Sequence, residues 1–244
     1  MSLLCGALSA IGGALVVPYL AVLFPEVREA PVPLIGLAAL QGIQAGVLST
    51  GLAYVGLRCG RLVGLGAPWL AARLGGRQLQ KRPMFVRAAV IGFVGGLLVL
   101  AIDTLGFAPH LPVPIEQIPR PGPLDGLLAS FYGGVTEEVL SRLFLVSALS
   151  WLGVKGLHLP RAIAVNFAIV LAALAFGAAH LPAAFQIIAP TGFVAMRTIV
   201  LNMLLGIPFG LMFVRRGLAH AIVMHFAADI ALHVAGPVLL EALS

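Results

Sequence analysis

The chain has 244 residues, of which 60% are hydrophobic and only 10% are charged. This composition excludes an ordinary soluble domain, because a soluble domain exposes far more charged side chains. The net charge of +6 does not indicate a nucleic-acid partner, since the basic residues lie beside apolar segments. The sequence therefore predicts a protein of the lipid bilayer with no nucleic-acid partner.

Seven apolar segments are long enough to cross a bilayer, which takes about 20 residues of helix. In chain order they are Leu3–Phe24, Leu34–Leu57, Met84–Phe107, Leu124–Leu152, Ala162–Ile188, Met196–Val214 and Leu218–Val234. A short eighth element is expected after Pro237. The segments lack the alternation of barrel strands, and backbone in lipid must be hydrogen-bonded internally. We therefore expect an all-α, polytopic transmembrane bundle of about seven or eight helices.

Basic residues concentrate in alternate loops, which predicts their side of the membrane. The three basic groups are Arg58, Arg61, Arg73, Arg77, Lys81, Arg82 and Arg87; Lys155 and Arg161; and Arg215 and Arg216. Cytoplasmic loops carry an excess of lysine and arginine, so these loops and the N-terminus are expected in the cytoplasm. Contact of the first group with anionic lipid is an alternative. Arginine outnumbers lysine amid much alanine, glycine and leucine, which favours a bacterial inner membrane.

One membrane domain, residues 1–244, is expected. Within it, the proline-rich stretch 108–125 predicts a non-cytoplasmic loop, because repeated proline prevents a continuous helix. Residues 1–108 form N-terminal helices of unassigned role, with Asp103 expected to reach water at the outer end of its span. Residues 124–235 contain the polar intramembrane motifs.

The first motif is the stretch GGVTEEVLSRLFL, residues 133–145, in the fourth predicted span. Glu138 and Arg142 are four residues apart, so on a helix they lie on one face and can form an ion pair. Glu137 is turned about 100° away and has no such partner, which leaves it free to exchange a proton. A purely structural ion pair is the alternative interpretation of this motif.

Two further motifs lie on later spans. FGAAH places His180 four residues after Phe176, and HFAAD places Asp229 four residues after His225, with His233 one turn further on. Taken singly, these residues have ordinary structural explanations, such as packing or a helix cap. Together with Glu137, they predict a carboxylate–histidine cluster inside the bundle.

Counted along their helices, Glu137 and His225 lie at similar depths in the membrane. His180 lies too near the outer side if its span starts at Arg161. Two arrangements remove the conflict: residues 155–161 continue as an interfacial helix, or the fifth span runs past a kink at Pro182 toward Ile188.

The patterns EExxxR, FxxxH and HxxxN/D, in this order, resemble the CAAX protease and bacteriocin-processing family of glutamate-dependent intramembrane endopeptidases. The resemblance covers about residues 124–235 and implies that they form a catalytic helical core. It implies hydrolysis of a peptide bond in a membrane-anchored or exported protein or peptide. The eukaryotic branch trims the last three residues after a prenylated cysteine. A bacterial member would mature a secreted peptide or cleave a C-terminal sorting helix.

The resemblance also implies roles for the site residues. Glu137 would be the catalytic glutamate that activates water together with His180. Glu138 and Arg142 would hold this arrangement in place, with Phe176 as a supporting member of the second motif.

Two schemes remain for the third motif. His225 and Asp229 would stabilise the oxyanion, or they would join Glu137 and His180 as metal ligands, for which zinc is suited. Many relatives have asparagine in place of Asp229, and an ionised aspartate cannot donate a hydrogen bond. This departure favours metal binding or orientation of His225, whereas the absence of an HExxH pattern favours the metal-free scheme. We expect the scheme that requires no cofactor.

Two non-enzymatic alternatives use the same residues. A binding or immunity protein would sequester a peptide in the polar cluster. A transporter would use Glu137, His180 and His225 as a proton relay. Transporters commonly contain two repeated halves, whereas here the motifs lie in one half.

Overall fold

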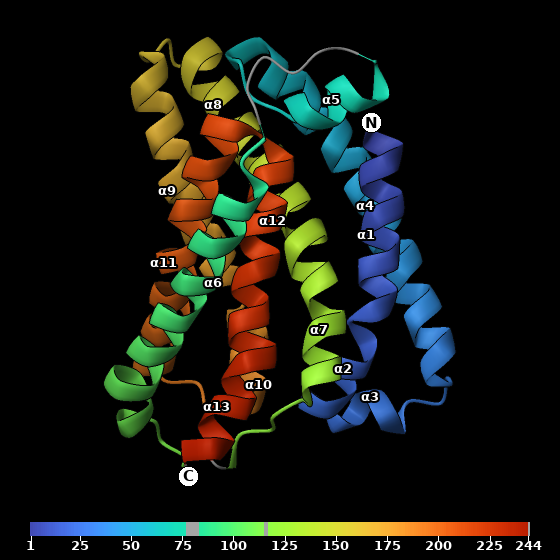
Figure 1. The fold of residues 1–244 in the computed structure, drawn as a ribbon, viewed down its shortest axis with the longest axis vertical. Helices are drawn as coiled ribbons and strands as arrows, with labels where there is room; N and C mark the ends of the chain where they lie inside the picture. Colours follow the sequence, from blue (N-terminus) through green and yellow to red (C-terminus); the bar gives the residue numbers. More distant parts are fainter. Residues whose placement is uncertain (77–82, 115–116, 244) are drawn as a thin grey trace.

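The structure is a computed structural model, and it describes residues 1–76, 83–114 and 117–243. Three residues of the first basic group, Arg77, Lys81 and Arg82, lie outside the described residues. The described part of the chain consists of helices and their connections, with no strand, as the composition predicts. The protein is therefore an all-α bundle (Figure 1).

The N-terminal half contains eight described helices. They are α1 (Ser2–Leu15), α2 (Val17–Leu23), α3 (Pro25–Glu29), α4 (Leu34–Val63), α5 (Pro68–Leu74), α6 (Phe85–Ile102), the π-helical η1 (Asp103–Phe107) and the 3-10 turn η2 (Ala108–His110). Gly64 ends α4 with a φ of 74°, a left-handed conformation that costs glycine little.

The C-terminal half contains the fourth to seventh spans. Its elements are α7 (Pro123–Phe131), η4 (Tyr132–Glu137), η5 (Val139–Val146), α8 (Ser147–Trp151), η6 (Leu152–Gly156), α9 (Arg161–Ala179), α10 (Leu181–Ile187), α11 (Gly192–Arg216), α12 (Leu218–Asp229), η7 (Ile230–Ala235) and α13 (Gly236–Leu243). The elements η4, η5, η6 and η7 are π-helical.

Seven helical stretches of the described residues are long and apolar enough to cross a bilayer, which confirms the predicted number. They are Ser2–Leu23, Leu34–Val63, Phe85–His110, Pro123–Gly156, Arg161–Ile187, Gly192–Arg216 and Leu218–Ala242. The protein is accordingly an integral membrane protein. The short element expected after Pro237 is present as α13, which continues the seventh span without a break.

The fifth span resolves the conflict in depth. Its helix α9 ends at Ala179, and α10 follows after His180 with Pro182 in its first turn. The span thus runs past the kink to Ile187, as the second arrangement predicts. The first arrangement is wrong, because residues 157–160 are not helical.

The fourth span and α12 lie next to each other inside the bundle (Figure 1). Helices α1 and α4 pack on the fourth span, while α6 and α11 pack on α12. Gly92 and Gly96 of α6 allow the close contact, since a Cβ atom at Gly96 would lie 2.6 Å from the carbonyl oxygen of Ala228. The fourth span and α12, which carry the first and third motifs, are in direct contact, and α6 packs closely on α12.

Asp103 corrects one expectation about the outer side. Its carboxylate does not simply reach water but accepts two hydrogen bonds from Arg197 of α11, at 2.6 and 2.5 Å. Each side chain is only 18% exposed. Because the partners are 94 residues apart, no local spacing could indicate this pair.

Candidate active site

The fourth span carries the paired glutamates on a stretch of π-helical turns. The segments Tyr132–Glu137 and Val139–Val146 lie on either side of Glu138. Widened turns of this kind are frequent at functional sites. The hydroxyl of Ser141 donates a hydrogen bond to the carbonyl oxygen of Glu137. This bond gives a partner to one backbone carbonyl group in the widened turns.

Glu138 and Arg142 form the buried side of the site. Nη1 of Arg142 lies 2.9 Å from Oε1 of Glu138, and the two side chains are 2% and 0% exposed. Arg142 also donates to Ser141 at 2.6 Å and to the carbonyl of Gly206 at 3.1 Å. A buried charge needs such partners, so this pair is fixed in position and closed to water.

Aromatic rings enclose the guanidinium. The ring centroids of Phe176 and Phe209 lie 4.8 and 5.3 Å from the central carbon of Arg142. This contact gives Phe176 of the second motif a physical role, since a ring face attracts a cation. Phe209 was not predicted, because nothing in its local sequence distinguishes it from a packing residue.

His225 is attached to the buried pair. Its Nδ1 lies 2.8 Å from Oε1 of Glu138, an oxygen that also accepts from Arg142. The carboxylate is therefore the acceptor, and Nδ1 of His225 carries the hydrogen. The ring stacks on Phe209 at a centroid distance of 4.5 Å. These contacts fix the direction of Nε2, which lies 3.8 Å from Oε2 of Glu137 and 3.5 Å from Oδ1 of Asp229.

His180 approaches Glu137 from the other side. Nδ1 lies 2.7 Å from the carbonyl oxygen of Phe176. A carbonyl only accepts, so Nδ1 carries the hydrogen and the opposite nitrogen, Nε2, is free to accept. This Nε2 lies 4.0 Å from Oε1 of Glu137, and the two side chains are 37% and 21% exposed. Glu137 and His180 thus form the open side of the site.

The structure brings the four predicted catalytic residues, Glu137, His180, His225 and Asp229, into one cluster. Gly133 leaves room for it, because a Cβ atom there would overlap Oδ2 of Asp229 and lie 3.5 Å from Nε2 of His225. The attachment of His225 to Glu138 was not predicted, since the two residues are 87 positions apart.

His233 does not join the cluster, although it continues the stripe of the third motif. Its Nδ1 is instead 3.0 Å from the hydroxyl of Tyr19, which comes from α2 in the N-terminal half. The two rings also meet edge to face, with centroids 5.4 Å apart. The side chain of His233 is thus held on the N-terminal helices rather than in the cluster.

The donor types suit zinc, but their spacing does not. Two imidazole nitrogens and a carboxylate are ordinary zinc ligands, with bonds of about 2.0–2.2 Å, which places neighbouring ligand atoms about 3.4 Å apart. The separations from Glu137 to the two histidines are 4.0 and 3.8 Å. Within the described residues, no group of three or more His, Cys, Asp or Glu side chains is arranged to hold a metal ion.

The fold and the cluster define an integral membrane protein with a carboxylate–histidine site inside its helical bundle. Residues 119–231 match the family model described as Type II CAAX prenyl endopeptidase Rce1-like. This part of the chain, which contains all of the predicted site residues, is similar to the CAAX protease family. The match supports a CAAX-protease-type intramembrane endopeptidase with a membrane-associated substrate. No curated protein and no solved structure matches the chain.

Proposed function

We propose that the protein hydrolyses a peptide bond of a membrane-anchored or exported protein or peptide, using water activated by Glu137. The main support for this proposal is the contrast between two adjacent carboxylates. Glu138 is fully buried and paired, whereas Glu137 is 21% exposed and faces Nε2 of His180. In this proposal Glu137, rather than Glu138, accepts a proton from water that reaches the site.

The distance between Glu137 and His180 suits a shared water. A water about 2.8 Å from each atom fits between Oε1 and Nε2, which are 4.0 Å apart. As this water attacks the carbonyl carbon, its proton passes to the carboxylate of Glu137. The same proton later passes to the leaving amine as the carbon–nitrogen bond breaks. His180 orients the water through a nitrogen that Phe176 leaves free to accept.

His225 supplies the complementary group in this scheme. Its Nδ1 donates to Glu138, so Nε2 donates to an oxyanion only when the ring is doubly protonated. An imidazolium here would have Glu138 on one side and Asp229, 3.5 Å from Nε2, on the other. Asp229 therefore orients His225, a role that an ionised aspartate can fill. The scheme requires no metal or other cofactor.

The substitution Glu137→Gln tests this proposal. Glutamine keeps the size of the side chain but is not a base, so cleavage should fall by at least about 10²- to 10⁴-fold. New protein termini in membranes of expressing cells, mapped by mass spectrometry, provide the readout and name the substrate. The matched control is Glu26→Gln on α3, an exposed glutamate outside the site.

Both variants should reach the membrane at the level of the wild type. If cells that express Glu137→Gln contain the same new termini as cells that express the wild type, Glu137 does not activate the water. If the wild type binds a peptide but produces no new termini, the binding or immunity protein is favoured instead.

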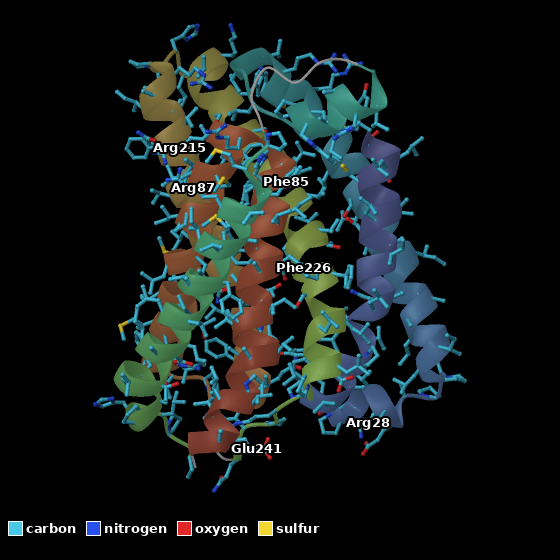
Figure 2. All side chains as sticks on the ribbon, viewed as in Figure 1. Arg28, Phe85, Arg87, Arg215, Phe226 and Glu241 are labelled. Atoms are coloured by element: carbon cyan, nitrogen blue, oxygen red, sulfur yellow. The ribbon has the colours of Figure 1, made fainter. Side chains whose placement is uncertain are left out.

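We further propose the bacterial inner membrane with a cytoplasmic N-terminus, because the described basic residues Arg87 and Arg215 lie at one end of the bundle (Figure 2).

A further inference from the structure

The helix α4 carries a polar residue on its exposed side. Gln44 is exposed and lies near the middle of the uncharged stretch from Leu34 to Leu57. This stretch is about 36 Å long, so it fills the hydrocarbon core of a bilayer, which is about 30 Å thick. Within residues 1–76, 83–114 and 117–243, the side chain of Gln44 has no hydrogen-bond partner. An amide without a partner in hydrocarbon is unfavourable, so Gln44 favours contact with a polar group outside the single chain.

Gln44 belongs to a row of exposed residues along α4, which we name the Gln44 stripe. Its members follow one another at intervals of three, four or seven residues, so they share one side of the helix. They are Leu40, Gln44, Leu48, Gly51, Val55 and Leu62. Gly51 lies two turns from Gln44, and no atom is within 4 Å of the place that a Cβ atom would take there. The backbone of α4 is therefore open to the close approach of another helix at Gly51.

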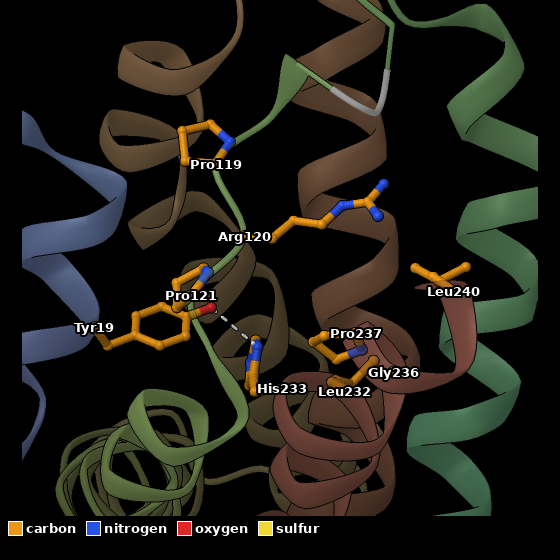
Figure 3. Close-up of a pocket in the computed structure, with 9 residues that line it drawn as sticks. All are labelled: Tyr19, Pro119, Arg120, Pro121, Leu232, His233, Gly236, Pro237 and Leu240. Carbon is orange, nitrogen blue, oxygen red and sulfur yellow. Dashed lines mark hydrogen bonds between the residues drawn. The ribbon is translucent and has the colours of Figure 1, made fainter. Parts of the chain in front are cut away.

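The rest of the chain does not cover the Gln44 stripe in the part that the structure describes. The other side of α4 is buried, and α4 packs on α1 and on the fourth span at the edge of the bundle (Figure 1). Tyr19 of α2 is hydrogen-bonded to His233 of η7, and both line the pocket shown in Figure 3. These contacts fix the N-terminal helices on the C-terminal half. The Gln44 stripe thus stays exposed and faces away from the fourth span.

We propose that the Gln44 stripe is the interface with a second copy of this chain. Two copies with the same orientation in one bilayer are related by a two-fold axis along the membrane normal, so a residue at this axis meets its own equivalent. An amide both donates and accepts hydrogen bonds, which allows the two Gln44 side chains to pair with each other. A self-complementary group at the centre of the stripe therefore indicates a second copy. The inference goes beyond the proposed function and does not depend on it.

Arg58 is a charged residue near the stripe, and its position is compatible with this pairing. Its guanidinium donates to the hydroxyl of Tyr54 at 2.9 Å, and its central carbon lies 5.2 Å from the centre of that ring. Tyr54 is about 80° around the helix from Gln44, so the charge is drawn away from the stripe. Arg58 is also about 21 Å along α4 from Gln44. Two copies can therefore meet at Gln44 without placing their arginines against each other.

Energy transfer between labelled copies tests the interface. Full-length protein carrying a donor or an acceptor fluorophore at the N-terminus is reconstituted in phosphatidylcholine liposomes over a range of protein-to-lipid ratios. We expect the wild type to associate as a dimer. Gln44→Leu should raise the dissociation constant about 3- to 30-fold, the effect of losing a hydrogen bond between membrane helices. Gln186→Leu, which changes an exposed glutamine of α10, is the matched control and should associate as the wild type does.

A second variant tests the close approach of the helices. Gly51→Leu fills the open position and should weaken association at least about tenfold, whereas Gly106→Leu, at another exposed glycine with open space, should not. A wild type that stays monomeric at every ratio would overturn the proposal and leave the stripe to a different membrane protein. An unchanged dissociation constant in either α4 variant would also overturn it. Glu137→Gln should associate normally, so loss of cleavage in that variant is distinguishable from loss of the dimer.

Discussion

The two sides of the fourth span differ sharply although each contains a glutamate. On the buried side, Glu138 is 0% exposed and accepts from Arg142 and His225 through one oxygen. On the open side, Glu137 is 21% exposed and lies 3.8 to 4.0 Å from two imidazole nitrogens. The neighbours of a carboxylate, rather than its residue type, thus decide whether it stabilises the fold or is available for chemistry.

The two sides are also coupled. Glu138 fixes His225 through Nδ1, and this bond directs the other nitrogen of His225 toward Glu137. Phe209 stacks on His225 and also faces Arg142. The buried side therefore works as a rigid support that orients the open side, as the proposed catalytic role of the cluster requires.

The largest loss of stability is expected from Glu138→Gln, a substitution on the buried side. The substitution leaves the charge of Arg142 buried without its counter-charge, which costs about 3–5 kcal/mol. Activity should be lost together with stability, because His225 also loses a carboxylate partner. Resistance to SDS-induced unfolding, measured next to that of Glu137→Gln, provides the test. Equal stability of the two variants would contradict the distinction between the sides.

A smaller effect is expected from Gly133→Ala, which changes the open side alone. The added methyl group overlaps Oδ2 of Asp229, so this carboxylate must move. We expect a destabilisation of about 1–3 kcal/mol from overpacking and an activity loss of about 10²-fold from misplacement. The control is Gly51→Ala, where no atom lies within 4 Å of the added methyl group. Full activity of Gly133→Ala would show that the position of Asp229 does not matter.

The smallest effect is expected from Arg197→Gln, which breaks an ion pair outside both sides. The pair with Asp103 is partly exposed, so its loss should cost about 1 kcal/mol and leave catalysis unchanged. Unfolding and peptide cleavage are measured together, with Arg28→Gln as the charge-matched control. A large loss of cleavage would mean that the end of α11 that carries Arg197 contributes to the site.

The sequence determined the spans and the identity of the cluster. Apolar length and the lack of alternation predict seven membrane helices, since both are local properties that lipid selects directly. Spacing of four residues predicts the pair of Glu138 with Arg142 and the shared face of His225 and Asp229, because helix geometry alone relates these residues.

Only the tertiary structure decided how the motifs meet. The bond of Glu138 to His225, the stacking of Phe209 and the pairing of Tyr19 with His233 join residues that are far apart in the chain. Such contacts depend on the crossing of helices in three dimensions, which no single helical period encodes. The sequence therefore determines which residues lie within the membrane, and the packing of the helices decides which of them can react.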